Sequence, residues 1–222
     1  MSTDLADQQR RAAGAFAAAM VEDGMVIGYG TGRGAAAALE ALSVRVRAGL
    51  RLSGVPTSQR TVELCEKLGL KLVSLDDAPA LDLVIDGADE VDPHKQVLKG
   101  GGGALTREKL VALASKRRVL VMEAVKLVPR LGATRGLPIE VLAFGWRTTL
   151  SRIAAVLPGA ARREGPLSDN GGVLVDAPIP AGADLRARDR TIKGITGVIE
   201  HGLFLDLNPT IIVGAEGGAK IV

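Results

Sequence analysis

The residues best suited to do chemistry lie in one stretch of the chain, LDLVIDGADEVDPHKQVLKGGGGALTREK. It contains Asp86, Asp89, Lys99, a run of four glycines at Gly100 to Gly103, and Glu108. Carboxylates can transfer protons, while a lysine and backbone amides can stabilise a developing oxyanion. Each residue alone has an ordinary explanation as a turn former or a helix cap, but four consecutive glycines carry an entropy cost that a plain connection does not need. We therefore predict that this stretch forms an active site.

The elements predicted around this stretch bring its polar groups to the edge of a sheet. The apolar run Leu81 to Ile85 predicts a buried strand. The two aspartates follow its carboxyl end, which is where open α/β sheets bind ligands. The segment ALTREKLVALASKR predicts a helix with Leu105, Leu110 and Leu113 near one face. Glu108 then lies in the first turn of this helix, at the same crevice as the glycines.

A second glycine-rich loop follows the first predicted strand, Met25 to Tyr29. The loop GTGRG at Gly30 to Gly34 opens a helix, and such a loop can bind phosphate through backbone amides and the helix dipole. The loop also matches the loose G-x-G-x-x-A pattern of dinucleotide sites, which requires an acid at the end of the next strand. That strand, Leu50 to Val55, ends instead in Pro56-Thr57-Ser58, whose hydroxyls suit a phosphate or a sugar. We favour a sugar-phosphate loop over a dinucleotide site.

Strands and helices alternate over about the first 130 residues, which predicts an α/β domain with a doubly wound, mostly parallel sheet. Further strands are expected at Lys71 to Leu75 and Arg118 to Met122. The carboxyl ends of these strands would bring the glycine loop, the two aspartates, and Glu123 with Lys126 to one crevice.

From Leu137 the predicted order changes to β-α-β-β-α-β, which is typical of a ferredoxin-like unit and ends in a strand at Val198 to Leu207. The last segment of the chain should return to the first sheet. We therefore predict a catalytic domain of residues 1–131 plus 208–222 and a smaller α+β domain of residues 132–207.

Composition restricts the partners. The net charge of +3 favours anionic substrates slightly, but scattered arginines and few aromatic residues argue against nucleic acid. A single cysteine and two separated histidines predict no disulfide framework and no metal site. No segment is apolar enough to span a membrane, and the amphipathic N-terminal segment differs from a signal peptide. We expect a cytoplasmic protein with a small-molecule substrate.

Three segments stand out, GYGTG, IDGADEVD and KGGGGALTREK, and the last two are specific when they occur together. With them the sequence resembles the ribose-5-phosphate isomerase A family over essentially the whole chain. The resemblance implies an aldose–ketose isomerase of the pentose phosphate pathway that links ribose 5-phosphate and ribulose 5-phosphate without a metal or cofactor. It also implies a Rossmann-like domain with a ferredoxin-like lid, assembled as a homodimer or homotetramer.

The resemblance also implies which residues act. It places the catalytic base at Glu108 and gives catalytic roles to Asp86, Asp89 and Lys99. The implied substrate-binding residues are Thr31, Gly32, Arg33, Gly34, Asp86, Gly87, Ala88, Asp89, Lys99, Gly100, Gly101, Gly102 and Lys126. Related proteins usually read GTGST where this chain has GTGRG, so two hydroxyls are missing and Arg33 adds a donor suited to phosphate.

Two alternatives from other classes stay open. An acyl-CoA transferase of related fold would use a glutamate as nucleophile, but this chain is short for that activity. A sugar-phosphate-binding sensor module should carry a helix-turn-helix head, whereas the N-terminal helix here leads directly into the first strand. An assay with ribose 5-phosphate separates both alternatives from the isomerase.

Overall fold

The computed structural model describes residues 3–215 and 217–222. It divides into two compact units. The first consists of Met1–Ala88, Arg107–Lys126 and Leu207–Val222, and the second of Asp89–Thr106 and Leu127–Asp206. The predicted domains differ from these units mainly at residues 89–106, which the structure groups with the second unit.

The first unit is built on one six-stranded sheet. Its strands are β1 (Val26–Tyr29), β2 (Ser53–Pro56), β3 (Leu81–Asp86), β6 (Ser115–Met122), β12 (Thr210–Ala215) and β13 (Gly218–Ile221). They lie in the order β13-β12-β6-β3-β1-β2, and only the edge strand β13 runs antiparallel to its neighbour. The predicted doubly wound, mostly parallel sheet is therefore confirmed, as is the return of the last segment to it.

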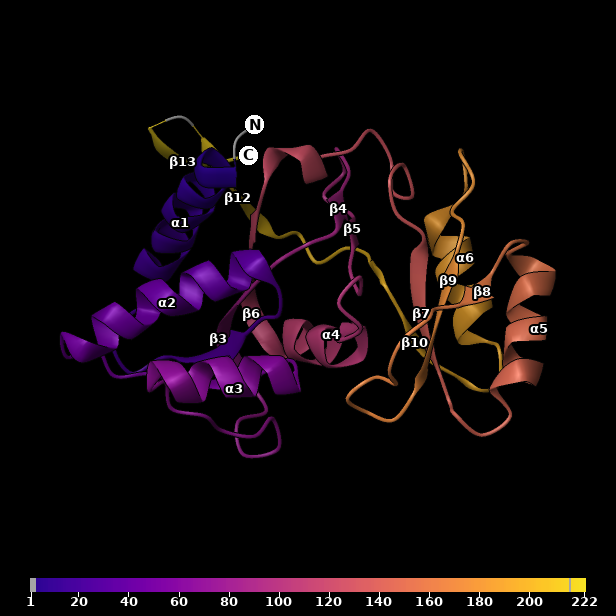
Figure 1. The fold of residues 1–222 in the computed structure, drawn as a ribbon, viewed down its shortest axis with the longest axis horizontal. Helices are drawn as coiled ribbons and strands as arrows, with labels where there is room; N and C mark the ends of the chain where they lie inside the picture. The colour runs from indigo at the N-terminus through magenta and orange to yellow at the C-terminus, as the bar shows by residue number, and fades with distance from the viewer. Residues whose placement is uncertain (1–2, 216) are drawn as a thin grey trace. The chain divides into compact units, whose positions relative to one another are not determined.

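Helices cover both faces of this sheet. They are α1 (Thr3–Ala19), α2 (Arg33–Arg47), α3 (Gln59–Leu68) and α4 (Leu105–Ala114), and a short 3-10 helix η1 (Ala124–Lys126) follows β6. The core joins Ile27 and Tyr29 of β1 to residues of α1, α2 and α3. On the other face of β1, a Cβ at Gly28 would meet Val111 of α4. Figure 1 shows α1 beside β12 and β13, which it contacts.

The second unit contains two antiparallel sheets. Its strands are β4 (Glu90–Val91), β5 (Val97–Leu98), β7 (Leu137–Val141), β8 (Ala161–Arg162), β9 (Val173–Ala177), β10 (Val198–His201) and β11 (Leu203–Phe204). The larger sheet has the order β10-β7-β9-β8 and the smaller one β11-β5-β4. Because β5 pairs with β11, the segment that carries the four glycines belongs to this unit.

Two helices, α5 (Trp146–Val156) and α6 (Leu185–Lys193), complete the ferredoxin-like arrangement (Figure 1). The chain order β7-α5-β8-β9-α6-β10 confirms the predicted β-α-β-β-α-β unit. Ile153 of α5 and Ile192 of α6 are fully buried in its core, with Ile139 and Val175 of the sheet.

Three local predictions were wrong. The expected strand at Lys71 to Leu75 is reduced to one bridge between Gly54 and Leu72, because Ser74 hydrogen-bonds Asp77 in a turn. The strand expected at Val198 to Leu207 splits at Gly202 into β10 and β11, which pair with different partners.

The third error concerns the face of α4. Leu105 is fully buried, but Leu110 and Leu113 are 53% and 60% exposed. At 3.6 residues per turn, a residue five positions after Leu105 points well away from it. The buried residues of α4 are instead Leu105, Glu108, Lys109, Val111 and Ala112.

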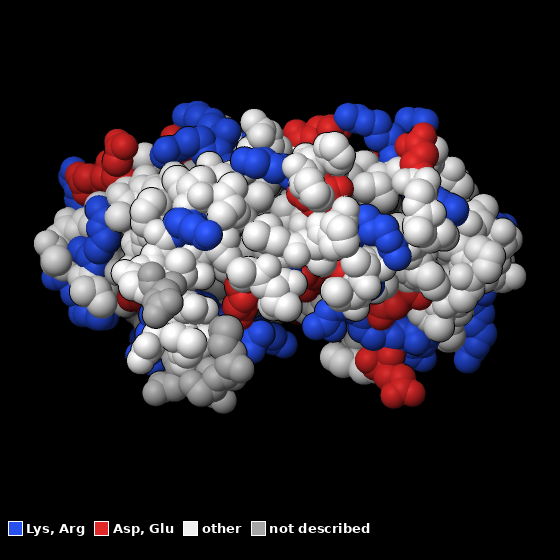
Figure 2. Space-filling model, turned by 90° about the horizontal axis from the view of Figure 1, so that it is seen from above, with Lys and Arg blue, Asp and Glu red and all other residues white. Residues whose placement is uncertain are grey.

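The surface carries charges of both signs. On the face drawn in Figure 2, the Lys and Arg side chains lie in separate small groups with Asp and Glu among them. On that face, therefore, neither sign of charge forms one continuous patch. Among the described residues, no helix combines the length and the apolar character that crossing a bilayer requires.

Candidate active site

Four neighbouring parallel strands of the first unit end at the same edge of the sheet. Their carboxyl ends lead to Thr31 after β1, Thr57 after β2, Asp86 at the end of β3 and Glu123 after β6. This edge is where open α/β sheets bind ligands. The prediction that these loops share one edge is confirmed for the first unit.

Asp86 connects two of these loops. Its Oδ1 accepts hydrogen bonds from the backbone N–H of Thr31 at 3.0 Å and of Gly87 at 2.7 Å. The Asp86 side chain is almost completely buried, and a Cβ at Gly30 would collide with its carboxylate. The chain therefore needs glycine at Gly30 so that the loop after β1 can approach this carboxylate.

The hydroxyl groups at this edge bond to one another. Thr31 Oγ1 lies 2.7 Å from Thr57 Oγ1, 2.8 Å from Ser58 Oγ and 3.1 Å from Thr61 Oγ1. Thr57 is fully buried, and Ser58 accepts a hydrogen bond from the Thr61 N–H as the N-cap of α3. We interpreted the hydroxyls of Thr57 and Ser58 as suited to a phosphate or a sugar. In this structure they bond within the buried network, and that interpretation stays a prediction.

The glycine loop leads into α2 as predicted. Gly32 is the N-cap of this helix, with φ of 104°, and the Arg33 side chain is 75% exposed. At Gly34, a Cβ would collide with the carbonyl oxygen of Val121 on β6, so the helix starts directly against the sheet. Its N-terminus thus lies at the carboxyl edge of the strands, where a helix dipole favours an anion.

Glu123 lies among three cationic side chains in the first unit. Arg10 of α1 donates to its Oε1 through Nε at 3.1 Å and Nη2 at 2.9 Å, and Lys126 Nζ lies 3.3 Å from Oε2. Arg33 Nη2 lies 3.5 Å from Oε1, and Asp7 forms an ion pair with Arg10. Burial opposes ionisation of Glu123, but the charge of Lys126 and the hydrogen bonds from Arg10 outweigh it and lower its pKa to about 2.

Arg10 and Glu123 were not predicted as partners. Arg10 precedes Glu123 by 113 residues, so no spacing in the sequence connects them. A basic residue in an N-terminal helix and an acid after a strand were the only signals available. The cluster of Arg10, Arg33, Glu123 and Lys126 is called the cation cluster below.

Glu108 lies in the first turn of α4, as predicted, and its side chain is 5% exposed. The first turn of a helix favours a carboxylate, because unpaired backbone N–H groups and the helix dipole supply positive potential there. Glu108 and Asp86 thus both belong to the first unit and both are buried. A buried carboxylate is costly to desolvate, so two of them in one unit favour a functional explanation.

The remaining predicted residues belong to the second unit. Lys99 follows β5, and its side chain is 4% exposed. Its Nζ lies 5.9 Å from the centroid of the Phe204 ring, and its backbone N–H donates to the Gly202 carbonyl at 2.9 Å. An aromatic face attracts an ammonium group, so the Phe204 ring helps to hold the Lys99 side chain in place.

The four-glycine run forms a tight loop. Gly100 has φ of 101°, and its carbonyl accepts a hydrogen bond from Gly103 N–H at 3.0 Å. Gly101 N–H donates to Asp89 Oδ2 at 2.7 Å, and a Cβ at Gly101 would lie 2.7 Å from Asp89 Oδ1. Glycine is therefore required where the backbone meets Asp89. In this structure the Gly101 N–H binds the Asp89 carboxylate, and a contact of Gly101 with a ligand stays a prediction.

Glu90 is a buried acid whose role the sequence did not reveal. It follows Asp89 in the chain and is fully buried. Its carboxylate accepts four hydrogen bonds from the loop after Leu131. The donors are Gly132 N–H at 2.5 Å, Thr134 N–H at 2.5 Å, Thr134 Oγ1 at 2.6 Å and Arg135 N–H at 2.8 Å. Glu90 therefore connects the strand next to Asp89 to the loop after Leu131.

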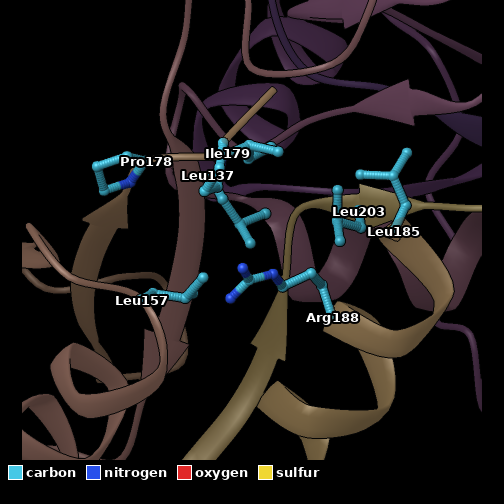
Figure 3. A pocket seen from close by; sticks show the side chains of 8 residues that line it. Leu137, Leu157, Pro178, Ile179, Leu185, Arg188 and Leu203 are labelled. Atoms are coloured by element: carbon cyan, nitrogen blue, oxygen red, sulfur yellow. The ribbon is translucent and has the colours of Figure 1, made fainter. Parts of the chain in front are cut away.

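The second unit also contains an apolar hollow away from these residues (Figure 3). It is lined by Leu137, Leu157, Pro178, Ile179, Pro180, Leu185, Arg188 and Leu203. The Arg188 side chain extends among the leucines in Figure 3, and its Nη1 donates to the Val156 carbonyl at 2.7 Å. None of the predicted site residues lines this hollow. In the described part of the chain, no group of three or more His, Cys, Asp or Glu could hold a metal ion.

Within each unit, the structure therefore groups part of the predicted site. The first unit carries Glu108, Asp86, Gly87, Ala88, the loop at Thr31 to Gly34, and Lys126. The second unit carries Asp89, Lys99 and the glycine loop. Ala88 and Asp89 are consecutive in the chain, so the two groups are joined directly by the backbone.

Known proteins resemble this chain over nearly its whole length. The matching family model is described as ribose 5-phosphate isomerase A (phosphoriboisomerase A) and covers residues 53–218. A ribose-5-phosphate isomerase A from Thermomicrobium roseum is 45% identical over 97% of this chain and 94% of its own. One from Methanoregula boonei is 44% identical over 100% of this chain and 96% of its own.

Solved structures agree. Ribose 5-phosphate isomerase A from Methanocaldococcus jannaschii matches with a TM-score of 0.90 and 31% identity, over 97% of this chain and 98% of its own. A D-ribose-5-phosphate isomerase in complex with phospho-erythronic acid matches with a TM-score of 0.92 and 33% identity, over 98% of both chains. Sequence and fold lead to the same conclusion: this chain belongs to the ribose 5-phosphate isomerase A family.

Proposed function

We propose that Glu108 is the base with which this chain interconverts ribose 5-phosphate and ribulose 5-phosphate. Moving the carbonyl between carbons 1 and 2 requires a group that takes a proton from one carbon and returns it to the other. A single carboxylate near both carbons can do this through a cis-enediolate. The observation that carries the proposal is the buried carboxylate of Glu108 in the first turn of α4, within the family segment ALTREK.

The enediolate needs hydrogen-bond donors at its oxygens. We assign these to the Lys99 ammonium group and to the amides of Gly100 and Gly102, while Gly101 N–H holds Asp89. One such donor typically contributes about 3 kcal/mol to transition-state stabilisation. Gly102 is exposed, which leaves its backbone accessible to a ligand.

Asp86 and Asp89 would accept hydrogen bonds from the sugar hydroxyls and assist ring opening. Each carboxylate is oriented by a backbone N–H, from Thr31 for Asp86 and from Gly101 for Asp89. A side chain held in this way keeps its direction when substrate binds, which reduces the entropy lost on binding. Gly87 and Ala88 connect the two aspartates and would contact the sugar through the backbone.

The phosphate would bind at the cation cluster and the start of α2. Arg33 and Lys126 supply positive charge, and the backbone from Thr31 to Gly34 supplies the helix N-terminus. Arg10 is added to the residues predicted from the sequence, because it shares the Glu123 carboxylate with both cations. Three cations against the carboxylates of Glu123 and Asp7 leave one net positive charge for a phosphate dianion.

The test is a comparison of activity and binding in Glu108→Gln. We expect isomerisation of ribose 5-phosphate to fall by about 1,000-fold or more while its affinity changes only a few-fold, since the amide cannot accept the proton. Glu66→Gln, at an exposed glutamate of α3, is the matched control. If Glu108→Gln loses affinity and activity together, the side chain is structural. If the protein were a sensor module or an acyl-CoA transferase, the wild type would not isomerise ribose 5-phosphate.

Three broader expectations stay predictions. A reaction without metal or cofactor predicts that the wild-type enzyme keeps its activity after treatment with a chelator and dialysis. A homodimer or homotetramer would be recognised by light scattering. The cytoplasmic location can be checked by cell fractionation.

A further inference from the structure

The carbonyl groups of the glycine loop are bound by an arginine that no step of the proposed mechanism uses. Arg163 follows β8, and its Nη1 donates to the carbonyl oxygens of Gly100 at 3.0 Å and Gly101 at 3.2 Å. The loop is also closed by the bond from Gly103 N–H to Gly100. Two consecutive peptide groups of the predicted cradle are therefore anchored to one guanidinium group.

Asp176 fixes the orientation of that guanidinium group. This residue of β9 accepts hydrogen bonds from Arg163 Nε at 2.7 Å and Nη2 at 2.6 Å. Arg163 N–H also donates to the Leu174 carbonyl at 2.8 Å. A two-point arginine–carboxylate pair sets the plane of the guanidinium group, and the remaining nitrogen then points to the glycine carbonyls. Arg163 is 21% exposed, so water screens the pair only partly.

The geometry of the peptide bond carries this constraint to the amides. A trans peptide directs its C=O and N–H to opposite sides, and the peptide bonds of this loop are trans. With the Gly100 carbonyl on Arg163, the N–H of Gly101 points away from the arginine and donates to Asp89. Because the Gly101 carbonyl accepts a hydrogen bond from Arg163, the N–H of Gly102 likewise points away from the arginine.

We propose that Arg163, held by Asp176, is a positioning residue for the isomerisation. It fixes the direction of the Gly102 amide and, through Gly101, the position of Asp89. A cation on a peptide carbonyl also polarises the N–H of the same peptide group, which strengthens it as a donor to an oxyanion. The inference rests on the proposed function, in which these amides stabilise the enediolate.

The first test is Arg163→Ala, measured for KM, kcat and inhibitor binding. Donors that act on the enediolate contribute to the transition state more than to the bound sugar. We expect kcat to fall about 100-fold, as for a catalytic group displaced by about 1 Å, while KM changes less than about two-fold. Phospho-erythronic acid carries a carboxylate where the enediolate has its oxygens, so its Kd should weaken by about the same factor as kcat.

Chemical rescue distinguishes positioning from general destabilisation. Millimolar guanidinium chloride should restore part of the kcat of Arg163→Ala, because the free cation can occupy the space beside Asp176 and the glycine carbonyls. Arg163→Lys keeps the charge without the planar fork and should lose about ten-fold in kcat. Asp176→Asn should lose a similar factor in kcat. Arg163 is unchanged in this variant, but the plane of its guanidinium group is no longer fixed. These two variants keep the test valid if Arg163→Ala folds poorly.

The matched control is Arg162→Ala. Arg162 is the preceding residue, and its guanidinium carbon lies 5.1 Å from the centroid of the Trp146 ring. The Arg162→Ala variant should retain the wild-type kcat, and added guanidinium chloride should not change that kcat. If the wild-type protein isomerises ribose 5-phosphate but the Arg163 variants keep their kcat, the inference is overturned while the proposed function stands. Equal losses in KM and kcat without rescue would also overturn it, whereas an inactive wild type would refute the proposed function itself.

Discussion

Asp86 Oδ1 accepts a hydrogen bond of 3.0 Å from the backbone N–H of Thr31, a residue 55 positions earlier in the chain. The same oxygen accepts the N–H of Gly87. Asp86 thus joins the loop after β1 to the end of β3, in addition to the part we propose for it on the substrate. These two contributions can be separated, because both structural hydrogen bonds end on one oxygen atom.

We predict that Asp86→Asn retains stability and loses activity. The asparagine amide oxygen can accept both N–H bonds, so the free energy of unfolding should stay within about 1 kcal/mol of wild type. Asp86→Ala leaves two buried N–H groups without this acceptor and should cost about 1–3 kcal/mol. Urea unfolding and the ketose assay on the same preparations test this. Full activity in Asp86→Asn would mean that the negative charge has no role in the reaction.

The mostly parallel sheet and the positions of Glu108 and Asp86 follow from patterns within short segments. Runs of apolar residues, the glycine loops and the α/β alternation are local signals, and the sheet edge then follows from parallel pairing. The boundary between the units was harder to predict, because residues 89–106 join the second unit through pairing between β5 and β11. Those two strands have two residues each and lie far apart in the sequence, so no local pattern connects them.

The hydroxyl network illustrates the same limit within the site. Thr57 and Ser58 have the residue types of a phosphate loop, but in the structure they bond to Thr31 and Thr61. Residue type gives the donors and acceptors that are present, whereas burial decides whether the protein or a ligand uses them. Arg10 shows the opposite situation. Its place in the sequence did not indicate its partner, and only the folded chain brings it to Glu123.

We predict that Glu123 makes the folded state sensitive to acid. Its pKa in the folded protein is about 2, below the ordinary value of 4.5, so ionised Glu123 stabilises the fold above about pH 4.5. That contribution is lost as the pH falls through about 2, and its upper limit is roughly 3 kcal/mol. Glu123→Gln should therefore be less stable than wild type at pH 7, and the difference should shrink towards pH 2. Urea unfolding at several pH values, with Glu66→Gln as control, measures this; a difference independent of pH would contradict the assignment.

We predict that Glu90 determines the order of the loop that follows Leu131. Its two oxygens accept four hydrogen bonds, three on Oε1 and one on Oε2. Glu90→Gln replaces one acceptor by an NH₂ group that faces an N–H donor, so the free energy of unfolding should fall by about 1–3 kcal/mol. Hydrogen exchange at Gly132, Thr134 and Arg135 should become faster. Thr134→Val removes one of the four bonds and should have a smaller effect on all of these quantities. Unchanged exchange in Glu90→Gln would show that the loop is ordered by other contacts.

We predict that Arg33 contributes to the binding of the phosphate group. Its guanidinium group is exposed at the N-terminus of α2, 3.5 Å from the Glu123 carboxylate. Water screens such a contact, so its contribution is on the order of 1 kcal/mol, which corresponds to about a five-fold change in KM. Arg33→Ser should therefore raise KM for ribose 5-phosphate about five-fold with little change in kcat, and KM should depend less on salt.

The control for Arg33 lies on the same helix. Arg47, at the opposite end of α2, is also exposed, and Arg47→Ser removes the same charge from the protein far along the helix axis. The KM of Arg47→Ser should stay at the wild-type value, because we expect the effect of Arg33→Ser to come from a local phosphate contact and not from the net charge. Unphosphorylated ribose gives a second comparison, since any turnover of it should respond to neither substitution. If Arg33→Ser and Arg47→Ser raise KM equally, the effect comes from the overall field of the protein, and the phosphate is bound by the remaining cations and the amides of the loop.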